Sequence, residues 1–148
     1  MLGPVIERAF DLDALLRAAV GPRWAGLSAA EQDGLRAAFR RFSIASWVAN
    51  FDSFDGQRFD ISPEPRASED GARVVETTLV GRADKPVTLS YVMRQGAGGW
   101  RVVDVLAEGS ISRTAVLRSD FRQALTTGGA AALEERLRAK AEALERGG

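Results

Sequence analysis

The sequence predicts a single α+β domain over residues 1–148, in which a curved antiparallel sheet of about four strands packs against several helices around an apolar cavity. Two patterns support this fold class. Apolar residues recur at helical spacing near both ends of the chain, and they alternate with a period of two in between. No linker is long enough to separate two domains, and 148 residues suffice to bury one full core.

Two helices are expected in the N-terminal third. The first covers residues 11–20 and ends at a Gly-Pro pair, which is a helix stop signal. The second runs from about residue 28 to 53 without an internal proline, and Ser28 and Glu31 have the spacing of a capping box at its start.

The long helix changes its apolar face along its length. Its first half carries one apolar face, formed by Leu35, Phe39 and Phe42. Its second half is apolar nearly all round, at Ile44, Trp47, Val48 and Phe51. Such a helix must be covered on more than one side. Two interpretations stay open: full burial in the core, or a ligand cavity lined by one of the faces.

Residues 57–108 are predicted to form a strand meander, because turn signals separate short runs that have a period of two. In the third run, one face carries Val87, Leu89, Tyr91 and Met93. In the fourth run, both faces are apolar except at Arg101 and Asp104. We therefore expect a sheet that is strongly bent or covered on both sides.

The C-terminal part, about residues 112–146, is predicted to be helical in two pieces. Leu117, Phe121 and Leu125 repeat at four-residue steps, and two glycines at 128 and 129 then break the helix. The last piece has a leucine stripe among mixed charges, which is typical of an amphipathic surface helix.

The composition argues against several classes of protein. The balance of 20 basic and 20 acidic residues makes nucleic acid an unexpected partner. The absence of cysteine and histidine removes the thiolate nucleophile, the usual general base and most metal-ligand sets. No apolar run is long enough to span a membrane, and the start lacks the pattern of an export signal. The chain as written is expected to be soluble, and it could equally follow a removed signal.

Two carboxylates stand out in the segment GWRVVDVLAEGSIS, residues 99–112. By simple alternation, Asp104 shares a face with Trp100, and a buried carboxylate there needs hydrogen-bond donors. Two roles stay open for it: accepting hydrogen bonds from a neighbouring loop or an arginine, or acting as a general base with Tyr91 as a hydrogen-bond donor. Glu108 and Gly109 are assigned a structural role, because glycine permits a positive φ at the turn.

Three segments of the chain are distinctive: FRRFSIASWVANFDSFDGQRFDI, GWRVVDVLAEGSIS and LRSDFRQALTTGGAAALEERL. The most specific parts are the stretch from Trp100 to Ser110 and the pattern R-S-x-F-x-x-x-L-x-x-G-G at 118–129. On these segments the chain resembles the MlaC-type family of periplasmic lipid-binding proteins, also called toluene-tolerance or ABC-transporter auxiliary proteins. In detail it is most similar to the hopanoid-biosynthesis-associated branch, HpnM.

The resemblance implies a periplasmic carrier, made with a cleaved signal and without catalytic residues, that holds acyl chains between a bent sheet and packed helices. The residues then expected to contact lipid are Phe39, Phe42, Ile44, Trp47, Val48, Phe51, Val75, Leu79, Leu89, Tyr91, Met93, Val103, Val105, Phe121 and Leu125. Asp104, Glu108 and Gly109 are expected to hold the corner between the last strand and the next helix.

Two arginine clusters partly follow helical spacing, Arg36, Arg40 and Arg41 in one case and Arg113, Arg118 and Arg122 in the other. They are interpreted either as solvated helix faces or as a rim that binds a lipid headgroup.

The sequence therefore predicts a soluble periplasmic carrier, not an enzyme, that shuttles phospholipid or a hopanoid-type lipid between inner- and outer-membrane transport machinery. Its expected partners are the lipid and membrane-anchored transporter components, contacted transiently, with no metal or other cofactor. Two alternatives stay open. One is a small cone-shaped enzyme of the isomerase or dehydratase type with Asp104 as general base, and the other is a module whose apolar groove receives a partner helix.

Overall fold

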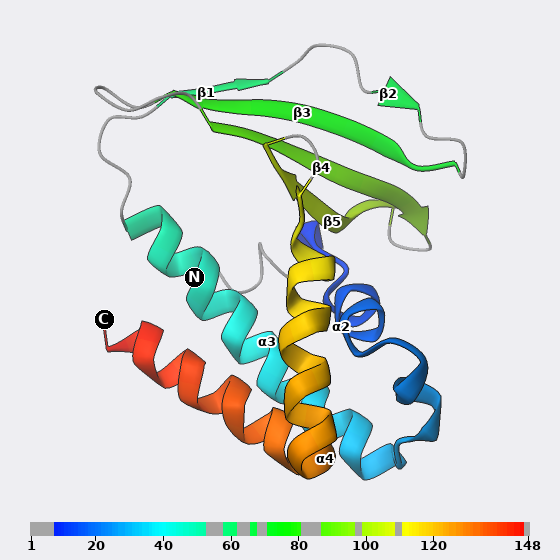
Figure 1. The fold of residues 1–148 in the computed structure, drawn as a ribbon. Helices are drawn as coiled ribbons and strands as arrows, with labels where there is room; N and C mark the ends of the chain where they lie inside the picture. Colours follow the sequence, from blue (N-terminus) through cyan, green and yellow to red (C-terminus); the bar gives the residue numbers. More distant parts are fainter. Residues whose placement is uncertain are drawn as a thin grey trace.

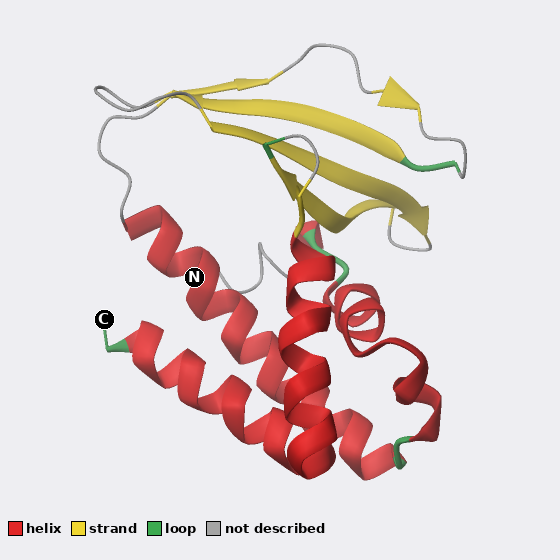
Figure 2. Ribbon diagram, viewed as in Figure 1, coloured by secondary structure: helices red, strands yellow, loops and turns green. Residues whose placement is uncertain are grey.

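The computed structural model describes residues 8–52, 58–61, 66–67, 71–80, 87–96, 99–108 and 111–146. They form two layers, an antiparallel sheet on one side and a group of helices on the other (Figures 1 and 2). The predicted α+β class, with an antiparallel sheet against helices, is thereby confirmed.

The described part of the helical layer consists of α2 (Leu12–Val20), the 3-10 helix η1 (Gly21–Gly26), α3 (Ala29–Asp52) and α4 (Arg113–Glu145). The start of α3 has the predicted capping box. The backbone N–H of Ser28 donates to Glu31 Oε1 at 2.9 Å, and the backbone N–H of Glu31 donates to Ser28 Oγ at 3.1 Å. Two N–H groups that the first turn leaves without helical partners are satisfied in this way.

The sheet contains β1 (Arg58–Ile61), β2 (Arg66–Ala67), β3 (Arg73–Val80), β4 (Val87–Gly96), β5 (Gly99–Ala107) and β6 (Ile111–Ser112). Neighbouring strands follow the order β1-β3-β4-β5-β6, β2 also pairs with β3, and all of these pairs are antiparallel. A parallel bridge between Phe10 and Val102 ties the segment before α2 to β5. The sheet is thereby joined to the helical layer on the side of β5.

A β-bulge in β5 changes which residues share a face of the sheet. Along β4, Tyr91 pairs with Val105 of β5 and Val92 pairs with Asp104. The next residue of β4, Met93, pairs with Val102, so Val103 of β5 has no partner and is the extra residue of the bulge. The expectation that Asp104 shares a face with Trp100 is therefore wrong. Simple alternation failed because one inserted residue reverses the side of every residue beyond it.

Helix α4 changes direction at Gly129, where φ is 71° and ψ is −160°. Its first half leads away from the sheet, and its second half returns beside α3 (Figure 1). The break expected from the two glycines thus appears as a sharp bend inside one long element. A Cβ at Gly129 would meet no atom within 4 Å, so the requirement for glycine there comes from the backbone angles alone.

Replacing Gly129 by alanine is expected to lower the free energy of unfolding by about 1–3 kcal/mol, because a Cβ is strained at this positive φ. Urea unfolding followed by circular dichroism measures the change. Gly26→Ala is the matched control, since a Cβ there also has open space but the backbone angle is ordinary. Equal effects of the two substitutions would contradict this account of the bend.

An ionic cluster joins the two halves of α4 across the bend. Arg136 Nη1 donates to Asp120 Oδ1 at 3.0 Å, and Lys140 Nζ donates to Asp120 Oδ2 at 2.8 Å. Arg136 Nη1 also reaches the backbone carbonyl of Asp120 at 3.2 Å. These cations, led by the hydrogen bond from Lys140, hold the pKa of the Asp120 carboxyl below its ordinary value.

The Asp120 cluster is expected to stabilise the fold in a pH-dependent way. A carboxyl whose pKa is lower in the folded state stabilises that state above its unfolded pKa, which is about 3.9, and the effect is lost as the pH falls through the folded pKa. Asp120→Asn should therefore cost about 1 kcal/mol near pH 7 and progressively less below about pH 4. Unfolding curves of both proteins between pH 7 and pH 3 test this, and a pH-independent difference would contradict it.

Candidate functional site

The inner face of the sheet, defined here as the side of Leu89, Tyr91 and Met93 on β4, turns toward the helices. These side chains are partly buried and pack against the hydrophobic core. Their neighbours in β5 are Val102 and Val105, which are themselves core residues. The inner face therefore provides an apolar surface opposite the helical layer.

The second half of α3 provides the opposing apolar surface. Ile44 and Trp47 are also partly buried and pack against the same core. Because each of these side chains is only partly covered, apolar surface remains accessible on both layers. Five residues that the sequence indicated as lipid contacts are thus half-buried against the same core cluster, namely Ile44, Trp47, Leu89, Tyr91 and Met93.

Phe10 is a buried core residue that contacts both α3 and β5, and sequence reasoning did not single it out. Its ring lies 4.9 Å from the ring of Trp47, and the next backbone N–H, of Asp11, donates to the Val102 carbonyl at 2.8 Å. Arg101 Nη2 donates to the Phe10 carbonyl at 2.9 Å. The available signal was its place just before the helix cap Asp11, where an apolar residue commonly packs onto the first turns.

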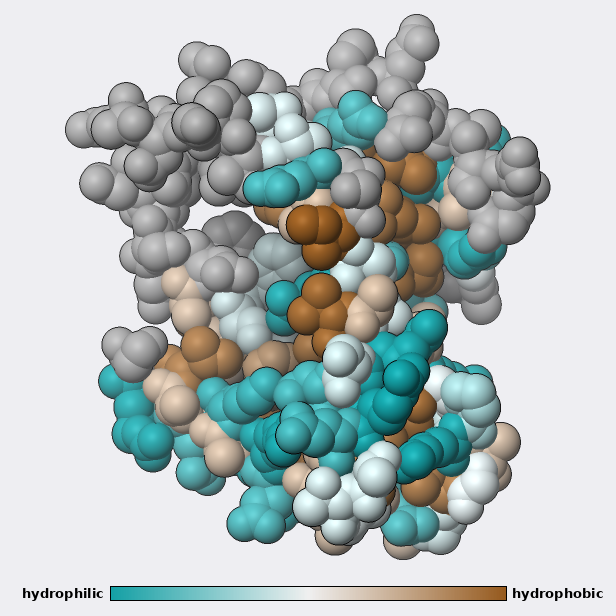
Figure 3. Space-filling view, in the orientation of Figure 1, coloured by the Kyte–Doolittle hydropathy of each residue, from teal (hydrophilic) through white to brown (hydrophobic). Residues whose placement is uncertain are grey.

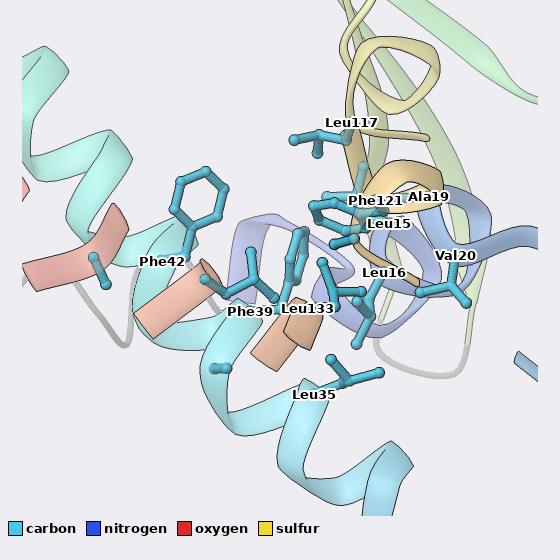
Figure 4. Packing of buried hydrophobic residues seen from close by; sticks show 14 of the residues in the cluster. Leu15, Leu16, Ala19, Val20, Leu35, Phe39, Phe42, Leu117, Phe121 and Leu133 are labelled. Carbon is cyan, nitrogen blue, oxygen red and sulfur yellow. The ribbon is translucent and has the colours of Figure 1, made fainter. Parts of the chain in front are cut away.

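Other predicted contact residues lie deeper. Phe39, Phe42, Val105, Phe121 and Leu125 are buried in the core cluster. Phe121, from α4, is only 1% exposed and meets the ring of Phe39 edge-on, at 6.2 Å between centroids. Figure 4 shows Phe39 and Phe121 within a group of leucines from α2, α3 and α4, with Phe42 farther along α3. These five side chains belong to the core on which the half-buried apolar residues pack.

Five predicted contact residues remain. Val48, Val75 and Val103 are partly buried, and Val103 is the extra residue of the bulge. The side chains of Phe51 and Leu79 lie outside the described residues.

Apolar surface is also exposed where the last strands meet the first turns of α4 (Figure 3). Ile111 is 50% exposed and Val116 is 59% exposed. Neither belongs to the buried core cluster.

Of the three β4 residues that define the inner face, Tyr91 carries a titratable group. Burial raises the pKa of its hydroxyl above the ordinary value of 10.0, because the phenolate would lose hydration. The hydroxyl is therefore neutral at physiological pH and can donate one hydrogen bond at an otherwise apolar surface.

Asp104 lies on the opposite face and is held by the start of α4. Its carboxylate accepts hydrogen bonds from Ser112 Oγ at 2.5 Å, from Thr114 Oγ1 at 2.9 Å and from the backbone N–H groups of Thr114 and Val105 at 3.1 and 2.8 Å. Ser112 is also the N-cap of α4, accepting from the Ala115 N–H at 3.1 Å. The pairing with Tyr91 that proton abstraction would require is not formed, since the two side chains point to opposite sides of the sheet.

Glu108 occupies the turn after β5. This residue itself adopts the positive φ, 54°, and its N–H donates to the Thr88 carbonyl at 2.8 Å. The structural role expected of Gly109 stays a prediction, because Gly109 lies outside the described residues. A left-handed conformation is uncommon for a residue other than glycine, and the side chain of Glu108 is exposed.

A pocket of about 260 Å³ opens where α2, α3 and β5 meet, with Leu16 and Phe39 in its lining and charged residues at its edge. Arg36 and Arg40 are among those charged residues. Arg36 is already paired, with its Nε 2.8 Å from Asp13 Oδ1 and its Nη1 3.0 Å from Asp33 Oδ1. Arg41 instead contacts Glu145 at 2.6 Å. The first arginine cluster is therefore divided between a pocket edge and the α3–α4 contact.

Within the part of the chain that the structure describes, no group of acidic side chains is placed to hold a metal ion. No helix in that part combines the length and apolar content needed to cross a bilayer.

The MlaC protein family model matches residues 1–139. Among solved structures, the chain is similar to a phospholipid-binding protein from Ralstonia solanacearum, determined in complex with a phospholipid. The two are 21% identical and superpose with a TM-score of 0.81 over 97% of this chain and 80% of the other. No curated protein matches the sequence. At this level of identity the structural match shows a shared fold.

Proposed function

Because the chain belongs to the MlaC family, we propose that it is a lipid-binding protein whose ligand lies between the inner face of the sheet and α3. One observation carries the proposal: apolar side chains on both layers, from Ile44 and Trp47 on one side to Leu89, Tyr91 and Met93 on the other, retain accessible surface. The similar fold of a phospholipid-binding protein from Ralstonia supports it.

The energetics of lipid transfer explain why apolar surface is needed on both layers. Each CH₂ group transferred out of water contributes about 0.8 kcal/mol, so a two-chain lipid with ~30 such groups leaves a bilayer only if a comparable apolar site receives it. Residues on two facing elements can cover an acyl chain from both sides. The neutral hydroxyl of Tyr91 could then bond to an ester or headgroup oxygen at little desolvation cost.

The finer proposal is a periplasmic carrier that moves lipid between transport machinery of the inner and outer membranes. Membrane-anchored transporter components would be its partners. The ligand would be a phospholipid or, as similarity to the HpnM branch suggests, a hopanoid-type lipid. These statements rest on the family resemblance rather than on the geometry.

The enzyme alternative is weakened by the position of Asp104. Its carboxylate already accepts four hydrogen bonds from the β5–α4 corner and faces away from Tyr91. The alternative of a groove for a partner helix uses the same apolar surfaces as the lipid proposal, so an experiment must separate them.

Native mass spectrometry of protein purified without detergent tests the proposal. We expect a bound species whose mass, after extraction, is that of a lipid with long acyl or polycyclic hydrocarbon parts. A phospholipid mass and a hopanoid mass distinguish the two ligand classes. Protein that neither carries lipid nor takes it up from phospholipid vesicles would contradict the proposal, and a bound peptide would favour the helix-binding alternative.

A further inference from the structure

We infer that Arg23, Arg118 and Arg122 form a binding site for a phosphate-type oxyanion. The three arginines line a pocket of about 220 Å³ between η1 and the first half of α4, together with Val20, Pro22 and Leu125. The volume is below that of typical pockets for whole drug-sized molecules, so it suits a small charged group rather than a complete lipid. Leu125 is the only residue it shares with the predicted lipid contacts.

The contacts of these three arginines differ from those of six other basic residues. Arg17, Arg36, Arg41, Arg136, Arg138 and Lys140 each contact a carboxylate. Among the described residues, no carboxylate pairs with Arg23, Arg118 or Arg122. The protein as a whole is neutral, but positive charge is left uncompensated at this pocket.

The sequence around the pocket explains this excess. No acidic residue occurs between Asp13 and Glu31, and Asp120 is the only one between Glu108 and Glu134. Asp120 is held by Arg136 and Lys140 at the bend of α4. The nearest carboxylate in the sequence is thus used elsewhere, and like charges at close range favour the binding of an anion.

Two of the arginines are oriented by neutral acceptors. Arg118 Nε donates to the Ala18 carbonyl at 3.0 Å, and Arg23 Nη2 donates to Thr126 Oγ1 at 3.3 Å. Each bond uses one N–H of a guanidinium that has five, so both side chains are positioned while most of their donors stay available. Arg122, one helical turn after Arg118, adds a third guanidinium on the same face of α4.

Phosphate is the chemical class that this arrangement fits. Guanidinium groups bind phosphate oxygens through paired, charge-assisted hydrogen bonds, and three arginine side chains line this one small pocket. The apolar lining from Val20, Pro22 and Leu125 would lie against carbon atoms attached to the phosphate. The same chemistry is available from free phosphate and from a phospholipid headgroup.

The test compares wild type with Arg122→Gln and with the double variant Arg118→Gln/Arg122→Gln. Arg122 has no hydrogen bond to the described residues, so its single substitution removes charge without removing an internal contact. The control is Arg138→Gln/Arg146→Gln, which removes two positive charges from exposed side chains, one in α4 where it pairs with Glu134 and one at the C-cap of α4. Circular dichroism checks that all variants are folded.

The probes are inorganic phosphate, added at constant ionic strength, and vesicles of phosphatidylcholine with or without phosphatidylglycerol. Arginine Nε–Hε resonances report phosphate binding, and flotation reports vesicle binding. We expect saturable chemical-shift changes with phosphate. The affinity should fall severalfold in Arg122→Gln and by about tenfold or more in the double variant, but by less than about twofold in the control.

If wild type binds phosphate and the pocket variants do not, the result would support the site with free phosphate as its ligand. If wild type and the control float with phosphatidylglycerol vesicles and the pocket variants do not, the result would support the site with a lipid headgroup as its ligand. Absence of both, or equal losses in control and pocket variants, would overturn the inference. Native mass spectrometry of the same variants keeps this result distinct from the lipid proposal, since co-purified lipid depends on the surfaces of α3 and β4.

Discussion

Replacing Trp47 or Leu89 by glutamate is expected to abolish lipid pickup. The two residues lie on opposite layers, Trp47 on α3 and Leu89 on the inner face of the sheet, and both retain accessible surface. An unpaired carboxylate against hydrocarbon costs at least about 4 kcal/mol, which corresponds to a roughly thousandfold loss of affinity. Native mass spectrometry and uptake of fluorescent phospholipid from vesicles measure the loss.

The matched control for these substitutions is Val116→Glu. It makes the same kind of change, from an apolar to an acidic side chain, at a position that is 59% exposed. We expect it to leave lipid uptake unchanged. Trp47→Phe serves as a second control, because it keeps an aromatic ring that can contact Phe10. If folded Trp47→Glu and Leu89→Glu proteins carried as much lipid as Val116→Glu, the lipid would have to bind elsewhere.

Asp104→Ala is expected to lower the free energy of unfolding by about 2–4 kcal/mol, or the melting temperature by roughly 6–12 °C. The alanine would leave the hydroxyls of Ser112 and Thr114 and the N–H of Thr114 without their acceptor at the β5–α4 corner. Thr114 is buried, so water cannot readily replace that acceptor. Differential scanning calorimetry and urea unfolding measure the change.

Asp33→Ala provides the comparison for Asp104→Ala. The Asp33 side chain is 75% exposed and its contact is an ion pair with Arg36, so we expect a change below about 0.5 kcal/mol. Asp104→Asn should fall between the two alanine variants, because an amide oxygen can still accept from Thr114. A stable Asp104→Ala protein with normal lipid binding would show that this carboxylate does not hold the corner.

Elements whose cause is local could be predicted from the sequence. The capping box of Ser28 and Glu31 depends on residues three apart, and the bend of α4 depends on a glycine that can adopt a positive φ. The apolar face of β4 followed from alternation within one strand. In each case the residues that decide the structure are neighbours in the chain.

The bulge at Val103 and the contact of Phe10 with Trp47 could not be derived in the same way. A bulge depends on how two strands align, and its effect on Asp104 appears only once β4 is paired with β5. The Phe10–Trp47 contact joins the segment before α2 to the end of α3. Neither leaves a clear periodic signal, because the partners are distant in the chain.

The arginines illustrate the difference between what the sequence determines and what the tertiary structure decides. Composition establishes a neutral protein, and local spacing places arginines on helix faces. Only the packing of helices shows that Arg41 contacts Glu145, whereas Arg23, Arg118 and Arg122 line one pocket and pair with no carboxylate of the described residues. The physical reason is that helix formation depends on hydrogen bonds within a few residues, whereas ion pairing and cavity lining depend on which surfaces the folded chain brings into contact.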